Sequence, residues 1–271
     1  MKIVSFNTNS IRLRLHQLEA LRDTHAPDII GIQETKCIDE NFPTDELNEI
    51  GYESVCFGQK THYGVAMLST RPMKAVQYGF TGDAEDAQRR LITATITSDK
   101  GNDVTVINGY FPQGENRSHE VKFPAKEKFY ADLQNKLETE HKKTDHLAVI
   151  GDFNVAPVDN DLGIGPDNVK RWLRAGTTCF LPEEREWLQK LMDWGLDDSF
   201  RVKYPDVDDL YSWFDYRSKG FDRDPKRGLR IDHLLSTAVM TKSLVDSGID
   251  YDIRAMEKPS DHCPAWSEFD V

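Results

Sequence analysis

Residues 147–154 read Leu-Ala-Val-Ile-Gly-Asp-Phe-Asn, and this stretch predicts a strand with polar groups at its end. Four apolar residues in a row are typical of a strand buried on both faces. Asp152 and Asn154 follow it, and residues two apart in an extended chain point to the same side. The two side chains can bind a hard cation or orient a water molecule, or they can close the strand in an Asx turn. The stretch by itself leaves both interpretations open.

The composition indicates a globular chain without a membrane segment. Of its 271 residues 38% are hydrophobic and 30% are charged, which is ordinary for a globular protein. No apolar run approaches the ~18 residues of a membrane helix, and the N-terminus shows no signal-peptide pattern. The four cysteines have no spacing typical of a zinc site or a disulfide framework. We therefore expect a cytoplasmic protein with reduced thiols.

The net charge of −12 argues against a polyanionic partner only as an average over the surface. Residues 170–174 hold three cations in five positions, and residues 217–230 hold six cations against two acids. Binding depends on such local patches more than on the net charge. The two segments therefore predict either solvated faces or contacts with a polyanion.

Apolar segments and helical periodicity interleave along the whole chain. Strands are predicted at 2–6, 28–32, 64–69, 91–97, 103–108, 147–150, 231–235 and 264–269. Helices are predicted at about 13–25, at 123–141 and at 183–194, the last between a proline and a glycine. No linker or low-complexity segment divides them. We expect one catalytic domain over residues 1–271.

Carboxylates, amides and one histidine recur at the ends of these strands. The set comprises Asn7, Glu34, Asp152, Asn154, Asp232, Asp261 and His262. If the strand ends converge, the carboxylates repel one another and favour a bound Mg²⁺ or Mn²⁺, with few cations in the same segments. Oxygen ligands with a single histidine argue against zinc. The pattern predicts metal-assisted hydrolysis of a phosphoester.

Two Asp-His pairs occur in these segments, and only one is expected to serve the site. Asp232 and His233 are neighbours on a strand and should face opposite sides, so His233 is expected to be a packed or surface residue. His262 precedes the last strand in a loop, where it and Asp261 can both face inward. Asp232 can orient the His262 imidazole for proton transfer or phosphate binding.

At this level of detail the sequence resembles the bacterial exonuclease III family of the endonuclease/exonuclease/phosphatase superfamily. The matching segments are Ser5–Asn9, Gln33–Lys36, His62–Ala66, Gln88–Arg90, Asn108–Gly114, Lys122–Lys126, Gly151–Asn154, Lys170–Arg174, Phe180–Trp187, Ser212–Arg217, Gly228–Asp232 and Ser260–His262. The resemblance implies a four-layered α/β sandwich, with two mainly antiparallel sheets packed face to face and helices outside. It also implies a monomer that acts on double-stranded DNA with abasic sites or with blocked or recessed 3′ ends.

The activity that the resemblance implies is that of a Mg²⁺-dependent DNA-repair nuclease. Such an enzyme cuts 5′ to abasic sites, digests duplex DNA 3′→5′ and cleans 3′ ends as a phosphatase or phosphodiesterase. The implied metal-site residues are Asn7, Glu34, Asp152, Asn154, Asp261 and His262. Among them Glu34 is the implied direct ligand. Whether one or two metal ions act in turnover stays open.

The resemblance also implies roles in the chemistry. Asp152 would orient and deprotonate the attacking water, and Asn154 would hold that water or the developing oxyanion. Tyr110 would donate a hydrogen bond to the scissile phosphate. His262, oriented by Asp232, would bind a phosphate oxygen and stabilise the pentacovalent state. Which of Asp152 and His262 is the general base stays open.

Substrate contacts are expected in two groups. Trp213, Phe214 and Leu229 would line a small apolar pocket for a base-less sugar flipped out of the helix. The less favoured alternative for Trp213 and Phe214 is packing in the core. The residues expected to meet phosphates or fill gaps in the duplex are Arg90, Gln113, Lys122, Lys170, Arg171 and Arg174.

Two alternatives remain beside this interpretation. A phosphatase of phosphoinositides or other lipids would keep the acids and the histidine, but it should lack segments 212–217 and 228–232. A DNA-binding scaffold with a decayed site should have lost at least one of the seven strand-end residues. Both segments and all seven residues are present, which favours the nuclease.

Overall fold

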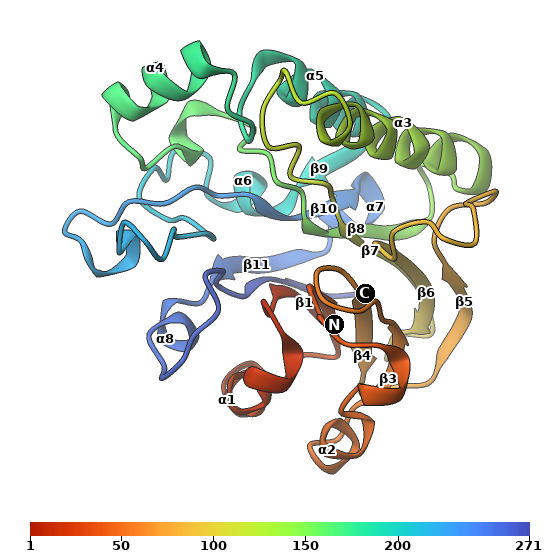
Figure 1. Cartoon of the computed structure of the whole chain (residues 1–271). Coiled ribbons are helices and arrows are strands. Elements are labelled where there is room, and N and C mark those ends of the chain that lie inside the picture. The colour runs from red at the N-terminus through yellow and green to blue at the C-terminus, as the bar shows by residue number, and fades with distance from the viewer.

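Two six-stranded sheets lie face to face in the computed structural model, which describes all residues 1–271 (Figure 1). The first sheet has the order β11 (Leu244–Ile249), β12 (Ala265–Phe269), β1 (Lys2–Asn7), β2 (Ile29–Gln33), β4 (Val65–Ser69) and β3 (Glu53–Phe57). The second has the order β5 (Met73–Tyr78), β6 (Leu91–Thr97), β7 (Asp103–Tyr110), β8 (His146–Asp152), β10 (Asp232–Thr237) and β9 (Leu196–Asp198).

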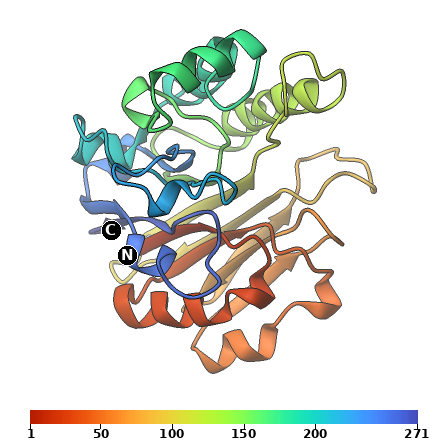
Figure 2. The same cartoon turned by 60° about the vertical axis from the view of Figure 1, so that its left-hand side comes forward.

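Helices cover the outer face of each sheet. Figures 1 and 2 show one group below the first sheet and another above the second. The lower group is α1 (Leu15–His25), α2 (Thr44–Glu49) and α8 (Tyr251–Arg254). The upper group is α3 (Lys122–Glu140), α4 (Pro166–Ala175), α5 (Pro182–Asp193), α6 (Ser199–Lys203) and α7 (Ala238–Thr241). Only the pairs β1–β2 and β7–β8 are parallel, so the predicted four-layered α/β sandwich of mainly antiparallel sheets is confirmed.

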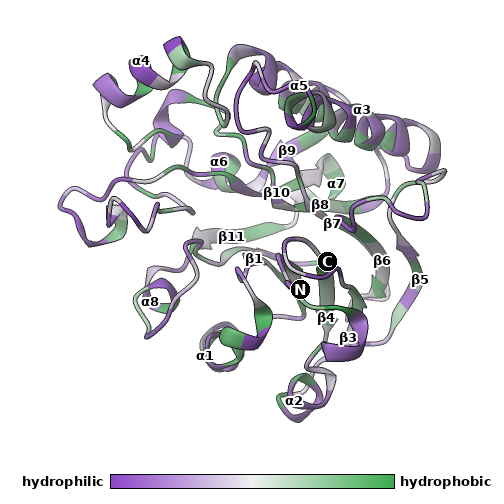
Figure 3. Cartoon of the chain, in the orientation of Figure 1, coloured by the Kyte–Doolittle hydropathy of each residue, from purple (hydrophilic) through white to green (hydrophobic).

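Strand β8 shows why the apolar run of residues 147–150 is continuous. Ala148 and Ile150 lie in the core between the two sheets, whereas Leu147 and Val149 lie in the core under α3 and α5. Successive side chains of a strand face opposite sides, so a strand covered on both faces needs apolar residues at every position. In Figure 3 the strands are accordingly greener than the outer faces of the helices.

Gly151 allows β8 to end close to its neighbour β7. A Cβ atom at this position would lie 1.9 Å from the main-chain oxygen of Gly109, its cross-strand partner. No other residue fits such an approach. The glycine therefore seats the end of β8, and with it Asp152, directly beside the end of β7.

All eight predicted strands and all three predicted helices are present, with ends within a few residues of those expected. Strands β3, β5, β9 and β11 were not predicted. β5 is largely exposed and lies at a sheet edge, and β9 has three residues, so neither carries a periodic apolar signal. Helices α2, α4, α6, α7 and α8 were not predicted either; α4 has no fully buried residue, but its Val169 and Trp172 pack against the cluster of Phe180. None of the helices is long and apolar enough to span a bilayer.

Candidate active site

The seven strand-end residues come from both sheets and meet where β1, β2 and β8 end and β10 begins. Asn7, at the end of β1, joins the sheets: its Nδ2 donates to Glu34 Oε1 (3.1 Å) and to Asp152 Oδ2 (2.9 Å). Its Oδ1 accepts from the main-chain N–H of Asn9 (3.0 Å). The Nδ2 group faces two carboxylates and the Oδ1 atom faces an N–H donor, so only one orientation of the amide satisfies all three contacts. Asn7 is therefore the bridge between the two candidate carboxylates.

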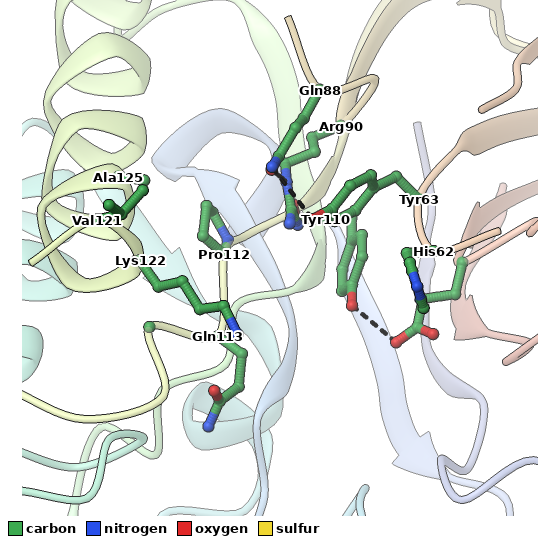
Figure 4. A pocket seen from close by; sticks show the side chains of 12 residues that line it. His62, Tyr63, Gln88, Arg90, Tyr110, Pro112, Gln113, Val121, Lys122 and Ala125 are labelled. Atoms are coloured by element: carbon green, nitrogen blue, oxygen red, sulfur yellow. Dashed lines mark hydrogen bonds between the residues drawn. The ribbon is translucent and has the colours of Figure 1, made fainter. Parts of the chain in front are cut away.

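Glu34 follows β2 in a left-handed conformation, with φ of 52°, and receives three donors. Besides Asn7, the Tyr110 hydroxyl donates to Glu34 Oε1 at 2.8 Å (Figure 4). Lys36 Nζ lies 2.8 Å from Glu34 Oε2 and also donates to Asn9 Oδ1. The expectation of a site with few cations is wrong at this point. Lys36 stands in the Gln33–Lys36 motif, but nothing in its local spacing reveals that it turns back onto Glu34.

The structure confirms the Asx turn at Asp152 and Asn154, whereas their binding of a cation or a water stays a prediction. Asp152 Oδ1 accepts from the main-chain N–H of Asn154 (3.0 Å), which is an Asx turn. Asp152 Oδ2 faces Asn7 and lies 3.8 Å from His262 Nε2. Asn154 has φ of 53° and its Nδ2 donates to the Phe111 carbonyl (3.0 Å). The turn therefore uses one oxygen of Asp152 and leaves the other in the site.

His262 is buried and held by Asp232, as the sequence predicts. The His262 Nδ1 lies 2.9 Å from Asp232 Oδ2, and Asp232 pairs with Asp152 across the sheet. Asp261, the next residue back, accepts from Asn9 Nδ2 (2.8 Å) and Trp213 Nε1 (3.1 Å). Asn9 is thus a second residue near the site that sequence reasoning did not single out.

Burial and charge shift the protonation of this cluster. Burial raises the pKa of Asp152 to about 7, although the His262 charge opposes the shift. Burial disfavours the charged form of His262, but Asp232 and Asp152 outweigh it and raise the pKa of His262 to about 10. The pKa of Tyr110 lies well above its usual value because the phenol is buried beside Glu34. At neutral pH the imidazole is therefore protonated and the phenol is neutral.

The donor set fits a hard divalent cation better than zinc. Asp152, Asp232 and His262 have ligand atoms within 4.8 Å of one another, but the two ring nitrogens face Asp232 and Asp152. The Glu34 carboxylate accepts hydrogen bonds from the Asn7 amide and from the Tyr110 hydroxyl. Oxygen ligands of this kind suit Mg²⁺ or Mn²⁺. Lys36 is the competing cation at this carboxylate.

His233 is a packed residue, as expected from its place beside Asp232. It is buried, with Nε2 2.7 Å from the Val155 carbonyl and Nδ1 2.9 Å from Arg230. Arg230 is itself buried and pairs with Asp161 and Asp198 at 2.6 Å each. Arg230 therefore belongs to the interior, although it stands in the cationic segment 217–230.

The structure corrects two of the three residues expected in the sugar pocket. Phe214 and Leu229 are fully buried. The Phe214 ring packs edge-on against Tyr211 and Phe221, and Leu229 lies in an apolar cluster with Phe180. Neither side chain can touch a ligand without opening the core. Trp213 is partly exposed, and its indole N–H donates to Asp261, so it is the one of the three that faces the site.

Arg90 differs most from expectation among the residues assigned to phosphates. Its guanidinium lies between the rings of Tyr63 (4.4 Å) and Tyr110 (4.5 Å). It donates to Gln88 Oε1 (2.7 Å) and the Tyr110 carbonyl (3.0 Å), and only 8% of the residue is exposed. Arg90 therefore packs on the Tyr110 ring and binds its main-chain carbonyl, and Figure 4 shows it beside Gln88 and Tyr110.

The other cationic and amide candidates lie at the surface. Gln113 and Lys122 line a cavity of about 360 Å³ together with Glu34, Arg90 and Tyr110 (Figure 4). The exposed residues Lys170, Arg171 and Arg174 lie on α4. A second cavity of about 260 Å³ lies between α4 and the segment 213–227, and Arg171, Trp172, Trp213, Arg223 and Arg227 contribute to its lining. Lys122 pairs with Glu115, whereas the three cations of α4 are exposed at the surface, where a polyanion can reach them.

Comparison with known proteins places the chain in a family. The model of the Endonuclease/Exonuclease/phosphatase family matches residues 4–262. Exodeoxyribonuclease III of Haemophilus influenzae is 56% identical over 269 residues, covering 99% of this chain and 100% of the relative. A 3′ phosphatase from Neisseria, solved with a product DNA hairpin, has a TM-score of 0.89 at 39% identity, with both chains fully covered. An AP endonuclease from Archaeoglobus fulgidus has a TM-score of 0.90 at 35% identity, with the same coverage. The chain therefore belongs to the Endonuclease/Exonuclease/phosphatase family and, within it, is a DNA-repair nuclease of the exonuclease III group.

Proposed function

We propose that this nuclease hydrolyses the phosphodiester 5′ to abasic sites in duplex DNA with Mg²⁺, and that it also removes 3′ blocking groups and digests recessed 3′ ends. The observation that carries the proposal is the bridge of Asn7 between Glu34 and Asp152, with the Asp232–His262 pair beside it. This cluster brings together a carboxylate that can bind a metal ion (Glu34), a carboxylate that can activate a water (Asp152) and a cation that can bind a phosphate (His262).

Asp152 is the proposed general base. A base must accept a proton at working pH, and the His262 pKa of about 10 keeps that imidazole protonated. The Asp152 pKa of about 7 lies near working pH, where a carboxylate is a competent proton acceptor. Protonated His262 instead supplies positive charge to a phosphate oxygen, and Asp232 keeps that charge in place. The Asn154 Nδ2 already donates to the Phe111 carbonyl. The Oδ1 of the same amide is therefore the atom proposed to hold the water.

Glu34 is the proposed ligand of Mg²⁺, with Mn²⁺ as a substitute, and Asn7 and Asp261 support the centre. When bound, the metal supplies Lewis-acid stabilisation of the phosphate charge. The Tyr110 hydroxyl now donates to Glu34, and it is the proposed donor to the scissile phosphate. Lys36 balances the charge of Glu34, which makes it part of the proposed centre.

Duplex DNA is the proposed partner. Gln113, Lys122 and the α4 cations supply polar and positive groups along one side of the site, where the phosphate backbone would lie. The Neisseria relative was solved with a product DNA hairpin, which supports this choice over a lipid phosphate. A monomer with one catalytic domain and a cytoplasmic location remain predictions. Four free cysteines agree with that location.

The decisive experiment is a product profile on three matched duplexes, one with an abasic-site analogue, one with a 3′-phosphate and one with a recessed 3′ end. We expect incision of the first and processing of the other two in Mg²⁺, and loss of all three in EDTA. Comparable cleavage inside an intact duplex would contradict selection of a base-less sugar. Activity that persists in EDTA would contradict the metal.

A further inference from the structure

Lys126 and Glu184 form an ion pair in the interior. The pair lies next to the backbone of Asn154, two residues after the end of β8. Both side chains are completely buried. Lys126 Nζ lies 2.5 Å from Glu184 Oε1, 2.9 Å from the main-chain carbonyl of Asn154 and 3.3 Å from that of Gln113. An ammonium has three donors, and all three are used. Two of them hold the backbone of residues already placed at the site.

Glu184 is anchored in turn by the start of helix α5. Its Oε2 accepts from the main-chain N–H groups of Cys179 and Leu181, both at 2.8 Å. The carboxylate therefore has a fixed place, set by three donors from two segments. Through Lys126 it links helix α5 and helix α3 to the backbone of Asn154.

The backbone of Asn154 needs such an anchor because it turns sharply after the strand. Its φ of 53° is in the left-handed region, which few residues other than glycine and asparagine adopt. This turn lets the carbonyl reach Lys126 while the backbone N–H binds Asp152 Oδ1. One turn along α3, the Tyr130 hydroxyl donates to the carbonyl of Phe153 (2.8 Å). Helix α3 thus holds two successive carbonyls of this segment.

Stability alone is a poor reason for this arrangement. Replacing a buried ion pair with apolar residues of similar size is often neutral or stabilising. An apolar side chain, however, cannot hold two main-chain carbonyls at once. We propose that Lys126, backed by Glu184, is a positioning residue for catalysis that fixes Asn154 beside Asp152. The inference rests on the proposed function, because it takes Asn154 as part of the active site.

The test separates positioning from stability with two variants. Lys126→Met leaves Glu184 buried and unpaired, whereas the double variant Lys126→Met/Glu184→Leu replaces the pair by apolar groups. We expect the double variant to recover part of the thermal midpoint that Lys126→Met loses, because no charge stays buried without a partner. It should remain below the wild type, because four main-chain groups lose their hydrogen bonds. Its kcat on the abasic duplex should stay at least about 10-fold low. We expect KM to stay within about twofold of wild type. Recovery of kcat together with the thermal midpoint would overturn the proposal.

Lys136 provides a matched control. It lies on the same helix, is also buried, and contacts Gln77 and Glu140 outside the site. Lys136→Met should leave kcat unchanged within about twofold. A loss as large as that of the double variant would mean that any buried lysine of α3 matters equally, and this result would overturn the proposal.

A double-mutant cycle with Asn154→Ala gives a readout that a purely structural lysine would not move. If Lys126 acts through Asn154, its substitution should change kcat less than about twofold in the Asn154→Ala background. Losses that multiply would overturn the proposal. A crystal structure of the apolar double variant does not depend on activity: we expect Asn154 to leave the left-handed conformation, and an unmoved Asn154 would overturn positioning. Absence of incision by the wild type would instead contradict the proposed function.

Discussion

Asp152 is the residue on which the proposed proton transfer depends. Replacing it with asparagine keeps the shape and the Asx turn, but the side chain no longer accepts a proton. We expect Asp152→Asn to lower kcat by at least about 10²-fold, the usual contribution of a general base. Binding of an abasic duplex in EDTA, measured by fluorescence anisotropy, should change little. A near-normal rate would rule out Asp152 as the proton acceptor.

The protonation of the same cluster predicts a bell-shaped pH dependence. The active form needs Asp152 deprotonated, so kcat/KM should rise with pH up to about 7, the pKa of Asp152. It also needs His262 protonated, so the rate should fall above a pH of about 10, the pKa of His262. Both limits are measured under single-turnover conditions. Asp152→Asn should remove the acidic limb from its residual activity, and an unchanged limb would assign it to another group.

Among the elements, α4 presents three exposed cations at the surface. It has no buried residue, so its cations do not serve the core. We expect Lys170→Ala/Arg171→Ala/Arg174→Ala to raise KM and to leave kcat and the thermal midpoint nearly unchanged. The slope of log Kd against log salt should shrink by about 0.9 for each phosphate that the variant no longer neutralises.

Lys100 offers the control for this triple variant. It is exposed in the turn between β6 and β7, at the end opposite to the one that carries Tyr110, and it pairs with Asp270. Lys100→Ala should leave both Kd and the salt slope unchanged. Equal weakening by the two variants would point to a diffuse charge effect and against DNA binding through α4.

For the whole molecule, the close packing of the two sheets holds the site together. A Cβ atom on Gly31 of β2 would lie 2.6 Å from Ile150 Cδ1 and 2.8 Å from Asn108 in the opposite sheet. We expect Gly31→Ala to lower the free energy of unfolding by about 1–3 kcal/mol, the usual cost of overpacking. Urea denaturation with an unchanged m-value measures it.

Ile150→Val removes the methyl group nearest to that new atom. In the Gly31→Ala background it should therefore cost less than it does alone, and it should recover part of the lost stability. Strictly additive losses would show that the two sheets do not touch at this point.

How much of this molecule was predictable depends on whether an interaction is local. The strands with continuous apolar runs and the helices with four-residue spacing were predicted, because burial on defined faces leaves that pattern in the sequence. Edge strands such as β5 were missed, because they bury too little to leave one. Helix α4 does have an apolar face, with Val169 and Trp172, but the cations of residues 170–174 obscured it. The polar residues at the strand ends were predicted as a group, because each directly follows or precedes an apolar segment in the sequence.

The residue patterns of the sequence defined the main strands and helices and the acids, amides and histidine at the strand ends, and its resemblance to the exonuclease III family implied the layered architecture. What each charged side chain does there became clear only from the folded chain. Arg90 and Lys126 both stand in motifs of the exonuclease III family, yet one packs between two tyrosine rings and the other holds the backbone of Asn154. The reason is physical: a long cationic side chain finds partners far away in the sequence, and only packing the two sheets and their helices brings those partners within reach.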